Sequence, residues 1–280
     1  MRPSTLAFVG LVFSASVGSS ACDIKTGGDG GFDIGISRGS AEDTWTRSYP
    51  LSAGGRLEVI NVNGRIDVSP STDGSVEVAA HRSAKATSDD AAKELLGRIE
   101  IREEVSDARV RIESRPPKFS GLSAHEVKWT IRVPKGVHVD LRTLNGGIRL
   151  TGLDGSVHAE TINGGVTGID LASAVIEASS VNGGIDIKVG TALGADGRVD
   201  AETVNGGVTF TLPADSKATI SARAVNGGVR VTELDVRKTG DEDSRRRLEG
   251  TLNGGGARVS LQTTNGGVRI LSSSTVKPTN

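Results

Sequence analysis

The sequence predicts an all-β protein whose larger part is a parallel β-solenoid, and two observations lead to this prediction. First, an Asn-Gly-Gly triplet recurs along the chain, and recurrence at a nearly fixed period is typical of repeat architectures. Second, apolar or small residues alternate with polar residues on both sides of each triplet, as in strands with one buried face. The triplets begin at Asn145, Asn163, Asn182, Asn205, Asn226, Asn253 and Asn265.

The composition indicates a core of unusual make-up. The 280 residues include 38 glycines but only 3% aromatic residues. Large aromatic side chains usually contribute heavily to a globular core, so we expect thin, regular layers of Val, Ile, Leu, Ala and Thr here. The formal net charge is −1, and without residues 1–21 it would be −2, because they carry only one charged residue, Arg2. Since no basic excess exists, the composition argues against nucleic-acid binding.

Residues 1–21 are predicted to be a signal peptide. Arg2 supplies a positive charge, and the apolar stretch 5–18 is too short to span a bilayer comfortably. Small residues then precede Cys22, the only cysteine of the chain. This arrangement resembles a bacterial lipoprotein signal, which implies lipid attachment at Cys22 and a membrane-anchored protein exported to the cell envelope. Ordinary secretory cleavage after Ala21 is the alternative.

Between the signal and the repeats, the sequence indicates two further segments. Residues 22–43 are Gly-rich and lack apolar periodicity, so they are predicted to be a tether. Residues 44–136 are predicted to be a strand-rich section that caps the solenoid and contains one helix, at about 88–97. Ser88 can cap that helix, Asp89 and Asp90 suit its positive end, and a degenerate repeat, Asn63-Gly64-Arg65-Ile66, lies in the same section.

The repeats occupy residues 137–271, followed by a predicted disordered tail at 272–280. When the repeats are aligned on Asn, the second, fourth and sixth residues before it and the third and fifth after it are mostly apolar or small. The other positions are mainly polar and are expected to face water. Asn and Gly tolerate the backbone conformations of a tight turn, so Asn-Gly-Gly could close a hairpin of an antiparallel β-meander or form a solenoid corner.

The spacing favours the solenoid. Successive triplets are 18, 19, 23 and 21 residues apart, about one solenoid coil, and the second arm is too short for a long antiparallel partner. In a parallel stack the Asn side chains would form a ladder along the axis. The spacing of 27 after Asn226 accommodates a charged loop, Arg237 to Arg247, whereas the final spacing of 12 suggests a truncated cap or a hairpin.

The repeated Thr-[Val/Ile/Leu]-Asn-Gly-Gly-[Val/Ile] units, the preceding strand-helix-strand section and the step Val133-Pro134-Lys135-Gly136-Val137 resemble one bacterial family. It is the "putative adhesin" family of envelope β-strand-repeat proteins, and the resemblance covers about residues 45–271. It implies an exported or membrane-anchored β-solenoid without established catalysis.

The charged residues that face outward raise the question of catalysis. Stacked rungs would place Asp140, His158, Glu177 and Asp200 in one column, and Arg142, Glu160, Ser179, Glu202 and Arg223 in another. Neighbouring carboxylates could serve glycoside chemistry, but pairing of Arg142 with Glu160 and of Glu202 with Arg223 explains the same pattern. We therefore predict no catalytic residue, no cofactor and no metal site, since the histidines lack metal-ligand spacing.

The sequence thus predicts a non-catalytic envelope adhesin or scaffold that binds an unknown macromolecule, protein or glycan, through its exposed faces. An extracytoplasmic envelope-stress sensor is the alternative, and a carbohydrate-active enzyme using Glu177 or Asp200 is a third hypothesis. The candidate binding face is a strip of four arginines that follow the turns: Arg149, Arg230, Arg258 and Arg269.

Overall fold

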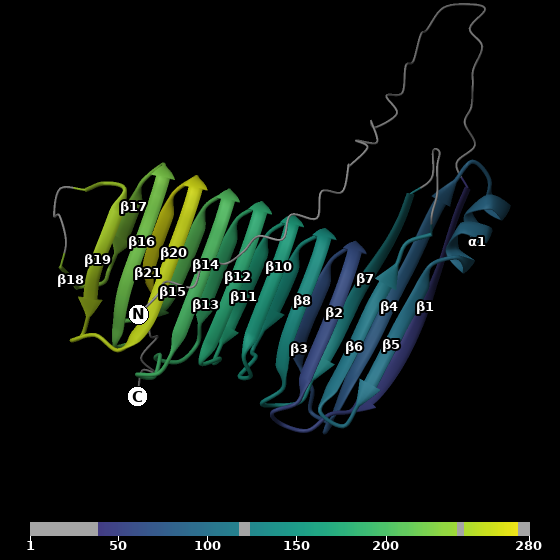
Figure 1. The fold of residues 1–280 in the computed structure, drawn as a ribbon, viewed down its shortest axis with the longest axis horizontal. Coiled ribbons are helices and arrows are strands. Elements are labelled where there is room, and N and C mark those ends of the chain that lie inside the picture. The colour runs from purple at the N-terminus through teal and green to yellow at the C-terminus, as the bar shows by residue number, and fades with distance from the viewer. Residues whose placement is uncertain (1–38, 118–123, 240–243, 274–280) are drawn as a thin grey trace, which may run out of the picture. The chain divides into compact units, whose positions relative to one another are not determined.

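The computed structural model describes residues 39–117, 124–239 and 244–273. They lie in one compact unit, Ser37–Asn280. The described ranges contain 21 strands and one helix, and the strands form two sheets (Figure 1). The predicted signal peptide, Cys22 and most of the predicted tether lie outside the described residues.

The first sheet, sheet A, contains ten strands in the spatial order β1-β4-β7-β3-β9-β11-β13-β15-β21-β17. In that order their bounds are Gly39–Pro50, Ser75–Ala86, Ala124–Val133, Ile66–Pro70, Ile148–Thr151, Val166–Leu171, Ile185–Val189, Val208–Pro213, Val268–Ser273 and Val229–Thr232.

The second sheet, sheet B, contains eleven strands in the order β18-β19-β16-β20-β14-β12-β10-β8-β2-β6-β5. Their bounds are Val236–Lys238, Arg247–Leu252, Ala218–Asn226, Ala257–Asn265, Arg198–Asn205, Val175–Asn182, Val157–Asn163, His138–Asn145, Arg56–Asn63, Arg109–Arg115 and Glu100–Ser106.

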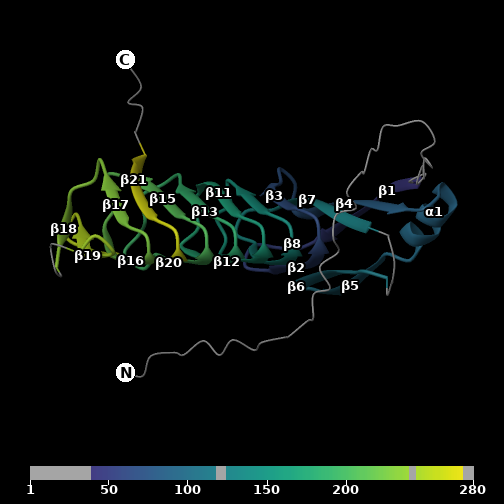
Figure 2. The same cartoon turned by 90° about the horizontal axis from the view of Figure 1, so that it is seen from above.

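The two sheets are joined at their Asn-Gly corners. A strand of sheet B ends at Asn, the chain turns, and the next strand lies in sheet A; we call this unit a rung. The two sheets lie face to face along the stack (Figure 2). Neighbouring rungs pair in parallel in both sheets, for example β10 with β12 and β11 with β13. The parallel pairing confirms the predicted β-solenoid and rules out an antiparallel meander for the repeats.

The corner side chains form a continuous Asn ladder. Apart from Asn63 at one end, each Asn amide nitrogen of the ladder donates to the amide oxygen of the Asn on the neighbouring rung, as Asn182 does to Asn163 at 2.9 Å. The corner backbone is linked as well, since Gly146 N donates to Asn163 O at 2.9 Å. In spatial order, the ladder contains Asn63, Asn145, Asn163, Asn182, Asn205, Asn265 and Asn226.

The two glycines of each triplet are under different constraints. A Cβ on the first glycine would meet a backbone oxygen of the neighbouring rung at 1.8 to 2.2 Å, as at Gly183, which lies against Gly164 O. A Cβ on the second glycine would find its nearest atom at 2.9 to 3.5 Å, as at Gly184. The degenerate rung has Arg65 at the second position. Close rung packing therefore requires the first glycine, whereas the corner accepts a side chain at the second.

Inside the solenoid, a second ladder of hydroxyl groups accompanies the corners. The residue two before Asn is buried, and in five rungs it is Thr or Ser, whose hydroxyl donates to the first glycine's carbonyl on the neighbouring rung. Thr203 Oγ1 donates to Gly183 O at 2.7 Å, and Ser180 Oγ donates to Gly164 O at 2.8 Å. These contacts satisfy buried polar groups beside an otherwise aliphatic core.

The order of the rungs departs from the order of the chain at one end. The last rung, β20 with β21, lies between the rung of β14 and β15 and the rung of β16 and β17. The predicted repeat at Asn253 does not form a rung. Asn253 has a φ of 50° in a turn between β19 and β20, and its amide nitrogen donates to Ala214 O and Ser216 O, each at 2.8 Å.

The inserted rung corrects two further expectations. Gln262 of β20 separates Glu202 from Arg223, so the predicted pairing of these two residues is wrong. The predicted charged loop 237–247 is in part a hairpin, because β18 and β19 pair in antiparallel fashion and β19 also pairs with β16.

At the other end, the sheets continue across the predicted boundary at residues 136 and 137. The degenerate repeat is a full rung, since β2 and β3 pair with β8 and β9. The helix α1, Asp89–Gly97, confirms the predicted helix, with Ser88 as its N-cap. It lies at this end beside β1 and β4 (Figure 2). Strand β1 begins at Gly39 and pairs with β4, so residues 39–43 are strand rather than tether.

Candidate functional site

The four arginines predicted to form one strip lie on both sheets. Arg149, Arg230 and Arg269 are on sheet A, whereas Arg258 is on sheet B beside Arg198. The prediction of one strip is therefore wrong. It failed because Asn253 is not a solenoid corner, so the residues after it enter sheet B rather than sheet A.

Arg149 also lies apart from the other two arginines of sheet A. The strands β11, β13 and β15 separate it from Arg269, and they carry Thr167, Asp186 and Thr209 at the same outward position. Arg149 is 3.9 Å from Asp67 on its own sheet. Only Arg230 and Arg269 are direct neighbours, on the paired strands β17 and β21.

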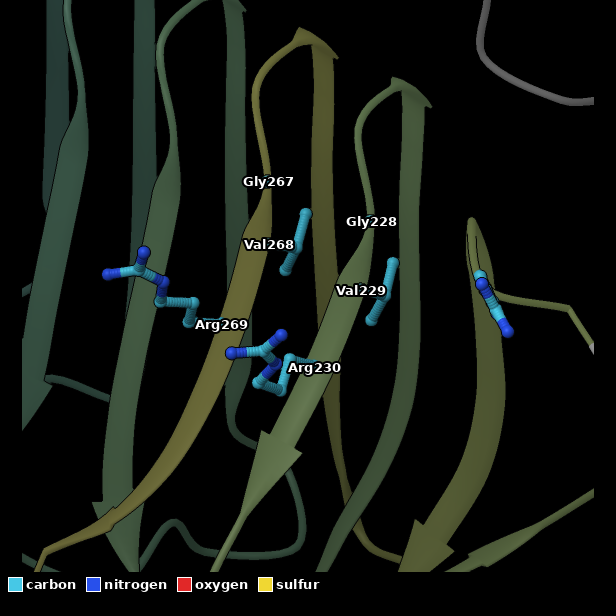
Figure 3. A pocket seen from close by; sticks show the side chains of 7 residues that line it. Gly228, Val229, Arg230, Gly267, Val268 and Arg269 are labelled. Atoms are coloured by element: carbon cyan, nitrogen blue, oxygen red, sulfur yellow. The ribbon is translucent and has the colours of Figure 1, made fainter.

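Arg230 and Arg269 border a hollow of about 500 Å³ at the end of sheet A (Figure 3). Their side chains extend in the same direction across the sheet. A third arginine, Arg245, also lines this hollow; it belongs to the charged run 237–247 and is not one of the predicted binding residues. The backbone of Arg245 is held in place because Val229 N donates to Arg245 O at 2.9 Å. The hollow is lined by Gly228, Val229, Arg230, Arg245, Gly267, Val268 and Arg269.

A second hollow, of about 360 Å³, continues from the first along sheet A. The two share Gly267 and Arg269. Its other lining residues are second glycines and outward polar residues of the preceding rungs, together with two aliphatic residues: Val166, Thr167, Gly184, Ile185, Asp186, Gly207 and Thr209. We call this second hollow the glycine groove. It runs across the strands, from rung to rung, rather than along any one of them.

The three arginines differ from most others of the chain in their partners. Within the described ranges, no ion pair involves Arg230, Arg245 or Arg269, which we call the arginine cluster. Arg230 and Arg269 are neighbours of like charge, which is unfavourable for the sheet itself. The cluster is therefore an exposed cationic surface without an internal counter-charge among the described residues.

On sheet B, by contrast, many of the outward charges of the central rungs are paired. His158 Nδ1 is 3.2 Å from Glu177, which is also 3.6 Å from Arg198, and Arg198 bonds to Asp200. The predicted contact of Arg142 with Glu160 is present at 3.8 Å. Glu177 and Asp200, the residues of the enzyme hypothesis, thus occupy an ion-paired surface and line neither hollow.

The pKa values that are displaced reflect such pairing or burial. Burial alone would raise the pKa of Glu58, but a hydrogen bond from Arg109 and the charge of Arg111 outweigh it, so the pKa of Glu58 is lowered. The hydrogen bond to Asp200 raises the pKa of Arg198. Burial, with the bond to Glu103, raises the pKa of Tyr49. Each of these groups has a structural partner, so the displaced pKa values do not indicate a catalytic pair.

Sheet B also carries a largely apolar column beside the Asn ladder, at the position immediately before Asn, where only the corner at Asn265 has a polar residue, Thr264. The most exposed of these residues are Leu144, Ile162 and Val225, at 37%, 41% and 44% of their surface. The residue before Asn points outward, and a strand with one buried face does not need an apolar residue there. The Val, Ile or Leu of the repeat motif at this position therefore forms an exposed apolar column.

Two further findings concern the described ranges. No three His, Cys, Asp or Glu side chains within them are placed to hold a metal ion. No helix within them has the length and apolar character needed to cross a membrane. Cys22, the predicted lipid attachment site, lies outside the described residues.

A comparison with protein families matches the repeat segment. Residues 137–271 match the family model described as Toastrack DUF4097. The repeat segment is therefore similar to Toastrack domains. The matched residues begin just before β8 and end within β21, so the match includes six of the seven corners of the Asn ladder. No curated protein matches the chain.

Two of the solved structures that match over most of the chain are bacterial proteins. A "putative cell adhesion protein" from Clostridium sporogenes is 16% identical, with a TM-score of 0.49, and the match covers 84% of this chain and 100% of that chain. A "putative adhesin" from Bacteroides fragilis is 12% identical, with a TM-score of 0.42, and the match covers 81% of this chain and 97% of that chain. At these values we draw no conclusion about function from either structure.

Proposed function

We propose that this protein is exported, anchored to the envelope membrane by a lipid on Cys22, and acts without catalysis as an adhesin or scaffold. It would bind a macromolecule of the envelope or of another cell surface through its exposed faces. One observation carries this proposal: the arginine cluster is exposed around a hollow and has no ion-pair partner among the described residues. An exposed charge that the fold leaves unpaired is available to a partner.

The repeat architecture supports a binding role. Each rung contributes one more copy of the same outward positions, so weak contacts can add up along the stack. An enzyme hypothesis has less support, because Glu177 and Asp200 are paired on an open sheet. Exposed ion pairs of this kind are common on soluble surfaces and have small energies.

The test measures binding of the purified full chain to intact cells and to isolated envelope fractions, titrated to saturation. We expect saturable binding that weakens at least about tenfold when Arg230→Gln and Arg269→Gln are combined, because charge-assisted contacts are lost. Arg258→Gln is the matched control, since it removes an unpaired arginine from the other sheet. Absence of saturable binding would contradict the adhesin role and favour the envelope-stress sensor. Lipid anchoring is tested separately, because Cys22→Ser should release the protein from membranes.

A further inference from the structure

We infer that the arginine cluster binds the anionic group of an acidic polysaccharide and that the glycine groove holds the sugar residues that follow it. This inference rests on the proposed binding function and names the class of its ligand. It is argued from the charge of the cluster, its fixed geometry, the size of the hollows and the chemistry of the groove.

The first step concerns charge. Arg230, Arg245 and Arg269 all line one hollow, and all three residues are exposed. A guanidinium binds carboxylate, sulfate or phosphate oxygens through two parallel hydrogen bonds, which gives both energy and direction. The fold supplies no such oxygens within the described ranges, so an external anion would also relieve the repulsion between Arg230 and Arg269.

The second step concerns geometry. Two of the arginines stand on the paired strands β17 and β21, and the third is fixed by its backbone. Val229 N donates to Arg245 O, and Ala224 N donates to Arg246 O, each at 2.9 Å. The three positions are therefore set by sheet hydrogen bonds, so binding an anion would require ordering only the side chains.

The third step concerns size and direction. A hollow of about 500 Å³ lies within the range of small-molecule sites and could take a sugar with its acidic substituent. The glycine groove continues from it through Gly267 and Arg269. The ligand should therefore be a chain that has an anionic group at the cluster and extends across the rungs.

The fourth step distinguishes a glycan from a peptide or a membrane. Thr167, Asp186 and Thr209 line the groove with hydroxyl groups and one carboxylate, which can bond to sugar hydroxyls. A flat lipid surface could touch the rim of the glycine groove but could not fill a hollow of about 360 Å³. An extended peptide is usually held by an open strand edge, but the groove crosses strands whose backbone groups are already paired.

The floor of the groove offers a way to block it. Gly184 and Gly207 are second glycines, and Arg65 shows that the corner accepts a side chain at this position. A Cβ on Gly207 would lie 3.3 Å from Gly267 O, so a small adjustment suffices. Gly207→Gln should therefore fill the groove while the solenoid remains folded.

The experiment measures binding of the full chain to hexagalacturonate, a carboxylated oligosaccharide, by titration calorimetry. The matched neutral probe is the same oligosaccharide with its carboxylates methyl-esterified. Oligoglutamate and vesicles containing phosphatidylglycerol represent an acidic peptide and an anionic membrane. We expect saturable binding of hexagalacturonate that is at least about tenfold tighter than that of the ester, since the ester cannot form charge-assisted bonds. Glutamate chains and vesicles should bind at least about tenfold more weakly.

Three variants test the location. Arg230→Gln, Arg245→Gln and Arg269→Gln combined should abolish saturable binding, and Gly207→Gln should weaken it at least about tenfold, while Arg258→Gln should leave it unchanged. Thermal unfolding checks that each variant is folded. If Gly207→Gln does not fold, Gly207→Ala replaces it as a smaller substitution. Equal binding of the ester, tighter binding of oligoglutamate or vesicles, or full binding by the folded triple variant would overturn the inference. Envelope binding without hexagalacturonate binding would overturn it and leave the proposed function standing.

Discussion

The middle of the solenoid and its C-terminal end contain the same repeat but differ in two ways. In the middle, each rung stacks on the rung that precedes it in the chain, and most outward charges of sheet B are paired. At the C-terminal end, the last rung is inserted between two earlier ones, and the arginine cluster at the end of sheet A has no ion pair among the described residues.

The difference shows what a repeat motif specifies. The Asn corner, the first glycine and the inward hydroxyl determine that a rung forms and in which register it stacks. They do not determine which rung becomes its neighbour, because every corner presents the same Asn amide: Asn205 accepts from Asn265 although Asn226 comes next in the chain. The order is decided by the connections, here the β18–β19 hairpin and the turn at Asn253, which place β19 against β16 and leave one side of β16 for β20.

The largest expected effect is a cross-link that tests the inserted rung. Glu202 and Gln262 occupy the same outward position on paired strands, so Glu202→Cys with Gln262→Cys should form a disulfide under mild oxidation. Glu202→Cys with Arg223→Cys should not, because one strand separates them and places their Cα atoms about 10 Å apart. Both pairs are made in a Cys22→Ser background and are scored by mobility on non-reducing gels. Cross-linking of the second pair alone would show that the rungs follow chain order.

The next largest effect concerns the two glycines of one corner. Gly183→Ala places a Cβ 2.0 Å from Gly164 O and should destabilise the fold by about 3 kcal/mol or more, because two rungs must separate. Gly184→Ala meets its nearest atom, Gly207 O, at 3.4 Å and should change stability by only about 0.5 kcal/mol. Chemical denaturation of both variants provides the measurement. Similar losses at the two positions would mean that the second glycine is also needed for stacking.

Much of the fold could be predicted from the sequence, because the repeat encodes local physics. Alternation around Asn-Gly-Gly fixes which side chains are buried, and nearly constant spacing fixes the coil, so sheets, corners and ladder follow. The helix at 88–97 was predictable because Ser88, Asp89 and Asp90 mark its start.

The failures come from long-range contacts. Asn253 carries the same triplet as the true corners, yet it bonds to Ala214 O and Ser216 O, and no local pattern indicates this. The predicted strip of arginines failed with it, since Arg258 follows Asn253 into sheet B. Arg245 was missed because its place beside Val229 depends on a loop that returns to the sheet edge. The hydroxyl ladder had a signal, the recurrent Thr or Ser two residues before Asn, whose partner only the stack reveals.

The smallest expected effect is a change of stability with pH, and it arises at the end of the Asn ladder that contains Asn63. Asn63 accepts from Asn145, so its amide nitrogen must donate, and it lies 3.2 Å from His125 Nε2. His125 Nε2 can accept this hydrogen bond only when the imidazole is neutral and carries its proton on Nδ1. The direction of the Asn ladder therefore assigns the tautomer of His125. Burial lowers the pKa of His125, in agreement with a neutral ring.

The sign of the pH effect follows from that direction. Because the folded-state pKa lies below the ordinary value of 6.5, the unfolded chain binds a proton first as the pH falls. The contribution of His125 to stability is therefore complete above about pH 6.5 and is lost as the pH drops through the folded-state pKa. Denaturation at pH 8 and at pH 5.5 should show a loss for the wild type that is smaller in His125→Gln, whose amide oxygen can accept from Asn63 at either pH. An equal loss of stability in the wild type and in His125→Gln would mean that the Asn ladder does not depend on the imidazole. The amide nitrogen of Asn63 would then have another acceptor.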